Sequence, residues 1–351
     1  MKKAAILLVL LQSVFIFASV KAEDKNNVLS ILTYDSYSVS EDIVATFEEE
    51  NQVRIQFIES GDGTTMLNQA ILSKEAPIAD VIIGLNSIML SRALDNDILL
   101  PYESPELANI PDLYKMDQGN DRALPFNFGN VCINYDTAWY AEKGLSVPAS
   151  WEDLIDPKYS GQLVVENPIT STPGIAFMLA TIAAFGEDGY IDYWKSLLAN
   201  KIEIADGWST AYYTNFSAGG GMGPQPLVVS YDASPAAAPF YAETEMETAP
   251  TASILSDGMC YQVVEFLGIL KGTQNQELAE KFIDAVLSKE WQEDLPGQMF
   301  VFPVNKNAIL PDVFTKFAVI PENPVMLDPV LINEKRDFWL QKWNDEILNN
   351  Y

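Results

Sequence analysis

The sequence has no histidine among its 351 residues and only two cysteines, Cys132 and Cys260. The missing histidine removes the commonest general base of enzymes and the commonest side-chain ligand of metals. Basic residues are scarce as well, since 21 lysines and arginines stand against 49 aspartates and glutamates, giving a formal charge of −28. Nucleic acids and anionic lipids are repelled by such a surface. We therefore expect no nucleic-acid partner, and at most a weak attraction for cationic ligands.

The first 22 residues have the pattern of a secretory signal peptide. Met1, Lys2 and Lys3 precede the apolar run AAILLVLLQSVFIFASV, and Ala22 precedes an abrupt change to EDKNN. A membrane anchor is the alternative, but the apolar run is shorter than the ~20 residues that a membrane span needs. We expect cleavage after Ala22, with no cysteine there to carry a lipid. This predicts a soluble periplasmic protein without stable membrane insertion.

The length predicts two domains. Removing residues 1–22 from the 351-residue chain leaves 329 residues and, without Lys2, Lys3 and Lys21, a formal charge of −31. Single hydrophobic cores stop growing at about 250–300 residues, so a chain of this length is expected to divide.

Apolar periodicity predicts an α/β fold. Strands alternate with helices in the first part, and the third strand is almost wholly apolar, which is typical of a parallel sheet covered on both faces. A second α/β unit spans about 130–256, and Trp339 and Trp343 are expected core residues of the last helix. Ligands of such sheets bind beyond the carboxyl ends of the strands. We predict strands at 27–37, 53–59, 79–85, 123–136, 227–235 and 256–270, helices at 40–51, 174–186, 190–200, 274–295 and 333–348, and a loop running into a helix at 61–75.

Seven short motifs stand out along the chain. They are LTYDSY, GDGTTMLNQ, ADVIIGLNS, PFNFGNVCINYD, TSTPG, GWSTAY and VVSYDASP. Their order and approximate spacing resemble those of the thiamine-binding proteins of ABC importers, which are type II periplasmic binding proteins, and the resemblance covers nearly the whole mature chain. GWS followed by SYxxSP is the more specific part, whereas turns like TSTPG also occur in related iron and polyamine binders.

The resemblance implies a two-lobe fold of the periplasmic-binding-protein type II. Each lobe would have a central, mostly parallel sheet flanked by helices, and two crossover strands would form the hinge. The first lobe would be discontinuous, residues 23–129 and 258–351, and the second would span residues 130–257. Thiamine or its phosphate esters would lie between the closing lobes and pass to the membrane permease of an ABC importer. We expect a monomer without a cofactor.

Matching the family motifs residue by residue gives a predicted ligand site. It draws on strand ends and helix starts of both lobes, and two residues at the end of the first strand are plausible additions. The matched residues are Asp62, Gly63, Ser171, Thr172, Trp208, Tyr231, Asp232, Ala233 and Ser234, and the additions are Tyr34 and Asp35.

These residue types suit the chemistry of thiamine. Trp208, Tyr231 and Tyr34 offer aromatic faces to its flat rings, and a cation over such a face gains ~0.5–2 kcal/mol. Asp35 and Asp62 offer carboxylates to the permanently charged thiazolium or to the amino group. Two alternatives remain open: the aromatic residues could be ordinary core, and the two aspartates could serve only their turns.

Thr170, Ser171 and Thr172 precede Pro173 at the start of a predicted helix. Hydroxyl groups and a first-turn proline are typical of helix starts, and one hydroxyl is expected to cap this helix. A helix N-terminus also attracts anions. We interpret Ser171 and Thr172 as binding the hydroxyethyl or phosphate tail of the ligand. A capped helix with no ligand role is the alternative.

The sequence departs from the family pattern in two places. AAAPFY follows SYDASP where the family tends to place another aromatic residue, and QMF precedes FPV where a tryptophan is common. Phe240, Tyr241 or Phe300 could take their place. The departures leave the fine identity of the ligand open.

Cys132 lies in the first expected crossover strand and Cys260 in the second. The export compartment permits disulfides, and crossovers of this fold class run side by side. We hypothesise a Cys132–Cys260 bridge that limits twisting of the lobes. Two buried free thiols are the alternative.

Other functions remain open on the same fold. A polyamine or ferric iron could replace thiamine, although Tyr212 and Tyr213 are helix neighbours that diverge by ~100° and would not converge on iron. A thiaminase-like enzyme would need a nucleophilic cysteine in the cleft, whereas both cysteines fall in predicted hinge strands. The sequence has no G-x-S-x-G motif, no P-loop and no metal-ligand spacing. We expect neither catalysis nor a metal site.

Overall fold

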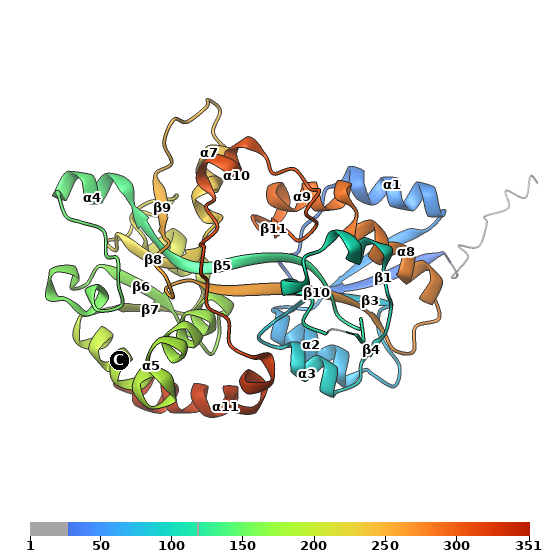
Figure 1. The fold of residues 1–351 in the computed structure, drawn as a ribbon, viewed down its shortest axis with the longest axis horizontal. Helices are drawn as coiled ribbons and strands as arrows, with labels where there is room; N and C mark the ends of the chain where they lie inside the picture. The colour runs from blue at the N-terminus through green and yellow to red at the C-terminus, as the bar shows by residue number, and fades with distance from the viewer. Residues whose placement is uncertain (1–26, 118) are drawn as a thin grey trace, which may run out of the picture.

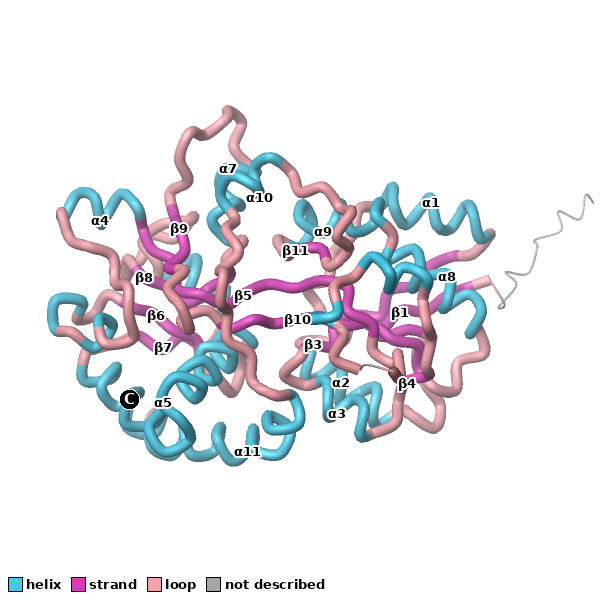
Figure 2. The backbone as a smooth tube through the Cα atoms, viewed as in Figure 1, coloured by secondary structure: helices cyan, strands magenta, loops and turns pink. Residues whose placement is uncertain are grey.

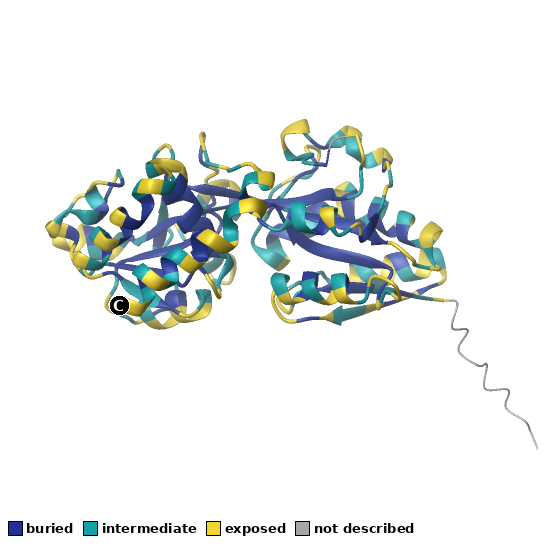
Figure 3. Cartoon of the chain, turned by 90° about the horizontal axis from the view of Figure 1, so that it is seen from below, coloured by how far each residue is buried: buried dark blue, intermediate teal, exposed yellow. Residues whose placement is uncertain are grey.

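A computed structural model describes residues 27–117 and 119–351. The predicted signal peptide and its cleavage after Ala22 lie outside the described residues. The described chain forms two α/β bodies joined by a narrow waist (Figures 1 and 3), and helices flank the strands in both (Figure 2).

The first lobe is built on a parallel sheet. Its elements are β1 (Val28–Thr33), α1 (Glu41–Asn51), β2 (Arg54–Glu59), α2 (Gly63–Leu72), β3 (Val81–Asn86), α3 (Leu90–Asp95), β4 (Leu99–Leu100), α8 (Gln276–Leu287), α9 (Lys289–Met299), β11 (Phe302–Pro303) and α10 (Asp312–Phe317). β1 pairs in parallel with β2 and with β3. All six residues of β3 are buried, as its apolar sequence predicts for a central strand.

The second lobe repeats this architecture. Its elements are α4 (Thr137–Lys143), β6 (Leu163–Glu166), α5 (Thr172–Ala199), β7 (Glu203–Ala205), α6 (Trp208–Thr210), β8 (Leu227–Tyr231), α7 (Ala237–Phe240), β9 (Thr251–Ile254) and α11 (Pro329–Glu346). β6 pairs in parallel with β7 and with β8. The carboxyl ends of these strands, like those of the first lobe, are the expected place for a ligand.

Two long strands, β5 (Leu124–Asp136) and β10 (Tyr261–Leu270), cross the waist side by side (Figure 1). They pair antiparallel, with Val131 opposite Tyr261, and join both lobes into one sheet of order β2-β1-β3-β10-β5-β8-β6-β7. Cys132 and Cys260 form a disulfide between these crossovers, with Cα atoms 4.4 Å apart. The predicted fold class, the paired hinge strands and the hypothesised bridge are thereby confirmed.

The last helix packs differently from the prediction, which placed residues 258–351 in the first lobe. Trp339 and Trp343 of α11 are fully buried in the core of the second lobe, as expected of core residues but in the other lobe. Trp343 makes an edge contact with Trp194 of α5 at 5.3 Å, and Tyr190 of α5 donates a hydrogen bond to Trp339 O. After α10 the chain therefore returns from the first lobe to the second, because the apolar face of α11 packs against α5.

The helix predicted over residues 274–295 is two helices, α8 and α9. Ser288 is in the extended conformation between them and its Oγ accepts a hydrogen bond from Trp291 N, which makes it the N-cap of α9. The side-chain amide of the buried Gln292 forms hydrogen bonds with three separate segments of the chain, and one of these bonds is from its Nε2 to Phe126 O at 2.7 Å. Periodicity alone missed the break because the apolar pattern continues across it.

α5 contains a break at Gly186, whose φ is +72°, between the two helices predicted at 174–186 and 190–200. Its length and composition would allow it to cross a membrane, but 61% of its most apolar window is buried inside the protein. Together with the aromatic contacts to α11, this makes α5 the central core helix of the second lobe.

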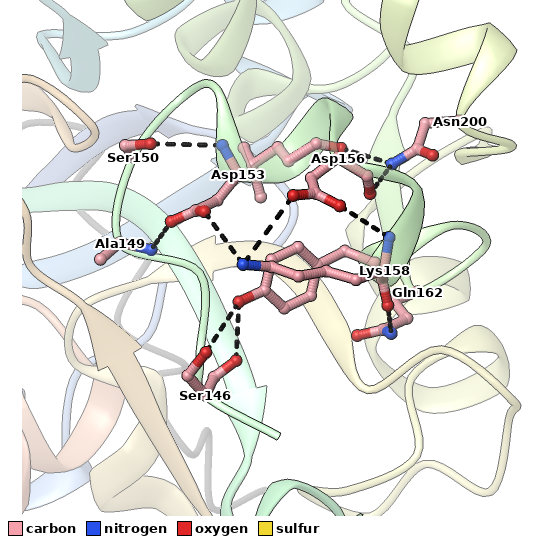
Figure 4. A network of polar contacts seen from close by, with 10 residues as sticks. Ser146, Ala149, Ser150, Asp153, Asp156, Lys158, Gln162 and Asn200 are labelled. Carbon is pink, nitrogen blue, oxygen red and sulfur yellow. Dashed lines mark hydrogen bonds and ion pairs between the residues drawn. The ribbon is translucent and has the colours of Figure 1, made fainter.

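A polar network fixes the loop before β6 (Figure 4). Asn200, at the end of α5, donates hydrogen bonds to Leu154 O and Asp156 O, at 2.9 and 3.1 Å. Lys158 Nζ lies 3.5 Å from Asp153 Oδ1 and 4.7 Å from the centre of the Tyr159 ring. These contacts hold the amino end of β6, so they position the strand whose other end faces the cleft.

Candidate ligand-binding cleft

A cavity lies between the two lobes where α2 and α5 begin. It brings together four predicted site residues from opposite lobes. They are Asp62 and Gly63, which start α2, and Ser171 and Thr172, which start α5. The cavity is further lined by residues of α3 and α11. Helix starts of both lobes thus face one space, although a ligand role for these residues stays a prediction.

The start of α2 uses Asp62 as its N-cap. Asp62 Oδ1 accepts a hydrogen bond from Thr65 N at 2.7 Å, so the carboxylate serves the local backbone, which was one of its two expected roles. Glycine at position 63 avoids a close contact, because a Cβ there would lie 3.2 Å from Met89 Cε. The N–H groups of Gly63 and Thr64 precede the hydrogen-bond ladder of the helix and are available to a ligand.

The start of α5 does not follow the expected capping pattern. None of the three hydroxyls caps the helix, because Pro173 has no N–H to donate to a capping oxygen. Thr170 Oγ1 instead donates to Asp206 O at 2.6 Å, which ties the loops after β6 and β7 together. Among the described residues, Ser171 and Thr172 have no partner for their hydroxyls. Both hydroxyls are therefore free for a ligand.

Gly174 explains how α5 comes so close to the end of β6. A Cβ at this position would lie 2.7 Å from Glu166 O and 2.8 Å from the carbonyl of Asn167. Only glycine fits there, so the TSTPG motif positions the helix start directly against the strand end.

Trp208 lies at the start of α6 and is half-buried. Its Nε1 donates a hydrogen bond to Ser230 Oγ at 2.8 Å, and its ring stacks on Tyr212 with centroids 5.0 Å apart. Ser234 Oγ lies 2.8 Å from Ser230 Oγ, so Ser234 helps to hold this arrangement. Trp208 is a fixed aromatic platform rather than a fully buried core residue.

Tyr34 and Tyr231 lie near the hinge, at the ends of β1 and β8. The Tyr34 hydroxyl donates to Glu265 Oε2 at 3.2 Å, and Asn127 Nδ2 donates to the same oxygen at 2.9 Å. The Tyr34 ring covers Gly84, where a Cβ would be 2.3 Å from the ring and φ is +104°. Burial raises the pKa of Glu265 to about 7. Glu265 was not predicted as a site residue, although an acidic residue inside the apolar run VVEFLG indicates a buried carboxyl group.

Asp232 and Ala233 face the interior rather than the cavity. Asp232 is fully buried and accepts hydrogen bonds from Asn130 N at 3.0 Å and Asn130 Nδ2 at 2.6 Å. Burial raises its pKa to about 7 against the opposing effect of these bonds. Ala233 is fully buried in the core of the first lobe. These two residues therefore anchor the end of β8 to the hinge strand.

Glu166, at the carboxyl end of β6, was not predicted as a site residue. It is fully buried, and neither carboxylate oxygen has a hydrogen-bond partner among the described residues. Burial raises the pKa of this carboxyl well above its usual range. Burial also raises the pKa of the nearby Tyr231, and Glu265 and Glu166 add to that shift. The signal in the sequence was a lone acid ending the apolar strand LVVE.

The remaining predicted residues lie at the margins. Asp35 is exposed, and its backbone N–H donates to Gly61 O at 2.9 Å, which links the ends of β1 and β2. Phe240, Tyr241 and Phe300 form one aromatic cluster with centroids 5.2–5.7 Å apart, where α7 meets the end of α9. Whether this cluster reaches a ligand stays a prediction.

Tyr212 and Tyr213 do not form a pair of ligands. Tyr212 is buried under Trp208, whereas the side chain of Tyr213 is 54% exposed and its ring stands at 79° to that of Tyr212. Within residues 27–117 and 119–351, no three histidine, cysteine, aspartate or glutamate side chains are grouped as metal ligands.

Two α/β lobes, joined by paired hinge strands and with a polar cavity between them, define a two-lobe solute-binding protein. The chain belongs to the bacterial extracellular solute-binding protein family, whose model matches residues 76–320.

Curated relatives and solved structures are similar over almost the whole chain. A thiamine-binding periplasmic protein of Brucella melitensis is 26% identical over 92% of both chains, and one of Escherichia coli is 26% identical over 90% of this chain and 92% of its own. The solved structure of a periplasmic thiamin binding protein has a TM-score of 0.75 at 26% identity, covering 91% of this chain and 96% of its own. Iron-bound HitA from Pseudomonas aeruginosa, at 19% identity, has a TM-score of 0.72 over 91% of this chain and 99% of its own, which shows the shared fold.

Proposed function

We propose that this protein captures thiamine or its phosphate esters between its lobes in the periplasm and delivers it to the permease of an ABC importer. The mature chain acts as a carrier without catalysis. Closure of the lobes on the ligand produces the form that the permease recognises.

One observation carries the proposal. The hinge end of the cleft combines aromatic rings with carboxyl groups that no basic side chain neutralises. Glu166 and Glu265 owe their raised pKa to burial, and no lysine or arginine among the described residues acts on them. A permanent cation with flat rings supplies the missing charge and stacks on Trp208, Tyr34 or Tyr231. The named relatives at 26% identity support the same ligand.

The other end of the cleft suits the tail of thiamine. Ser171 and Thr172 have free hydroxyls, and the first N–H groups of α2 and α5 lie in the same cavity. These donors can bind the hydroxyethyl group or a phosphate on it. The ligand would therefore lie along the cleft, rings toward the hinge and tail toward the helix starts.

Calorimetric titration of the mature protein tests the proposal. Thiamine, its monophosphate and its diphosphate are compared with spermidine and ferric citrate. We expect saturable one-to-one binding of at least one thiamine form and weaker or no binding of the others. Binding of spermidine or iron without any thiamine form would assign the cleft to that solute instead. Recovery of unchanged thiamine after incubation would separate a carrier from a thiaminase.

A further inference from the structure

The cavity between the lobes has a charge opposite to that of the whole chain. Four arginines occur in the sequence, and two of them, Arg92 and Arg336, line this cavity. Asp62 is the one acidic residue in its lining, and its carboxylate caps α2. A chain with 49 acidic and 21 basic residues thus has an excess of positive charge at this end of the cleft.

The two arginines come from opposite lobes. Arg92 belongs to α3 of the first lobe and is held by a hydrogen bond from its guanidinium to Asn68 Oδ1 of α2. Arg336 belongs to α11, which is anchored to the second lobe through Trp339 and Trp343. α11 and α3 also touch directly, since Asn333 Nδ2 donates to Asp95 Oδ2 at 2.9 Å. A single anion in the cavity would therefore contact both lobes.

Among the described residues, neither guanidinium forms an ion pair with an acid of the cavity lining. Arg336 Nη1 lies 3.3 Å from Asp337 Oδ1, but that carboxylate is 97% exposed and outside the cavity lining. Arg92 forms no ion pair among the described residues. Burial lowers the pKa of Arg336 and the neighbouring Arg92 adds to this, against the opposing effects of Asp337 and Asp62. Two close, half-buried guanidinium groups are stabilised when an anion lies between them.

The remaining donors around the cavity favour a phosphate in particular. The free hydroxyls of Ser171 and Thr172 belong to residues that line the same space, and so do the starts of the ten-residue α2 and the 28-residue α5, whose first turns carry unpaired N–H groups except at Pro173. Helix N-termini bind phosphate through such N–H groups, and arginine binds it with two parallel hydrogen bonds. These are more donors than one alcohol oxygen can use.

We propose that this cavity is a phosphate subsite in which Arg92 and Arg336, from opposite lobes, bind the phosphate or diphosphate of a phosphorylated ligand. The proposal rests on the proposed function and narrows it: the preferred ligands are thiamine monophosphate and diphosphate rather than the free alcohol. Because the phosphate bridges the lobes, it also stabilises the closed form. α11 thereby contributes directly to ligand binding.

The test compares Arg92→Gln and Arg336→Gln with wild type by calorimetry. In wild type we expect the phosphate esters to bind at least about tenfold more tightly than thiamine, the scale of one charge-assisted contact. Each variant should remove most of this advantage and leave the thiamine affinity within about threefold. Lys335→Gln is the matched control, since it removes one charge from α11 at a residue paired with Glu187 outside the cavity.

The outcomes separate this inference from the proposed function. If thiamine binds but its esters bind no better, or if Lys335→Gln lowers ester affinity as much as Arg336→Gln, the phosphate subsite is wrong and the carrier function stands. If no thiamine form binds, the carrier function is wrong, and titration with inorganic pyrophosphate decides the subsite alone. Pyrophosphate binding to wild type but not to Arg336→Gln supports it, and equal or absent binding overturns it. Arg92→Gln gives an independent result from the other lobe should Arg336→Gln unfold.

Discussion

Glu166 is a lone acid at the end of an apolar strand, and its carboxylate is buried without a partner. An ionised carboxylate in such a place costs several kcal/mol unless a cation lies nearby, so burial favours its protonated form. Unpaired buried groups of this kind concentrate at functional sites. Under the proposed function, the thiazolium of the ligand would supply a cationic partner for this carboxylate.

Glu166→Gln should therefore weaken thiamine binding by about tenfold while leaving the thermal midpoint at pH 8 unchanged or raised. The amide keeps the shape and removes the cost of ionisation, so stability and binding should move in opposite directions. Calorimetric titration and scanning calorimetry measure the two quantities. Glu142→Gln, an exposed change on the same lobe, is the control. Equal thiamine affinity in both variants would exclude a ligand role for Glu166.

Trp208→Ala should weaken thiamine binding by at least ~1 kcal/mol, about fivefold, because one stacking or cation contact is lost. The change also frees Ser230 Oγ from its bond to Nε1, so folding is checked by circular dichroism. Trp139→Ala, on α4 in the same lobe, controls for the loss of a tryptophan elsewhere. An affinity unchanged from wild type in folded protein would mean that Trp208 serves only to cover Tyr212.

At the scale of the elements, the residues of the candidate site lie where helices begin and strands end. α2 and α5 both begin at the cavity, and β3 ends there at Asn86, so each lobe contributes loops and helix dipoles to one space. The hinge strands differ, because β5 and β10 run from one lobe into the other without ending at the cavity. The Cys132–Cys260 disulfide joins these two paired strands.

Titration of the denatured, unreduced protein with a thiol reagent should find no reactive thiols. The double variant Cys132→Ala with Cys260→Ala should lose about 2–4 kcal/mol of unfolding free energy, because the bridge closes a long loop with a sequence separation of 128 residues. Urea unfolding of oxidised wild type and of the variant measures this loss. Two reactive thiols per wild-type chain would contradict the bridge, and equal urea midpoints would show that it adds no stability.

At the scale of the molecule, the cleft has opposite electrostatic ends. Buried carboxyl groups lie near the hinge, and two arginines lie where the lobes meet at α3 and α11. A ligand with a cation in its rings and a phosphate on its tail matches this order. Because each end draws on both lobes, filling the cleft favours closure.

The hinge carboxyls predict how pH acts on stability and binding. Burial raises the pKa of Glu265 and of Asp232 to about 7, above the usual values of 4.5 and 3.8. Between about pH 4 and 7 the folded chain keeps protons that the unfolded chain has released, so their contribution to stability is largest at low pH and is lost as pH rises through 7. Binding of a cation has the opposite trend, since it needs the ionised carboxylates.

We therefore expect thiamine affinity to fall as pH decreases from 8 to 6. Glu265→Gln should flatten this dependence and the pH dependence of the thermal midpoint, because the amide does not titrate. Calorimetry across this range measures both profiles. Parallel profiles for wild type and variant would show that Glu265 does not control the response.

Several elements could be predicted from the sequence because their signals are local. The six buried residues of β3 and the hinge strands that carry Cys132 and Cys260 follow from apolar runs and motif order. The TSTPG motif led to Ser171 and Thr172, whose ligand role stays a prediction and whose free hydroxyls contradict the simple expectation of a cap.

The sequence by itself determined the fold class and the residue types at the strand ends, because periodicity and turn chemistry depend on near neighbours. The tertiary structure decided which distant residues share a space. It joined α11 to the second lobe, brought Arg92 and Arg336 to one cavity, and left Glu166 buried without a partner. These relations depend on long-range packing and desolvation, which no local pattern in the sequence records.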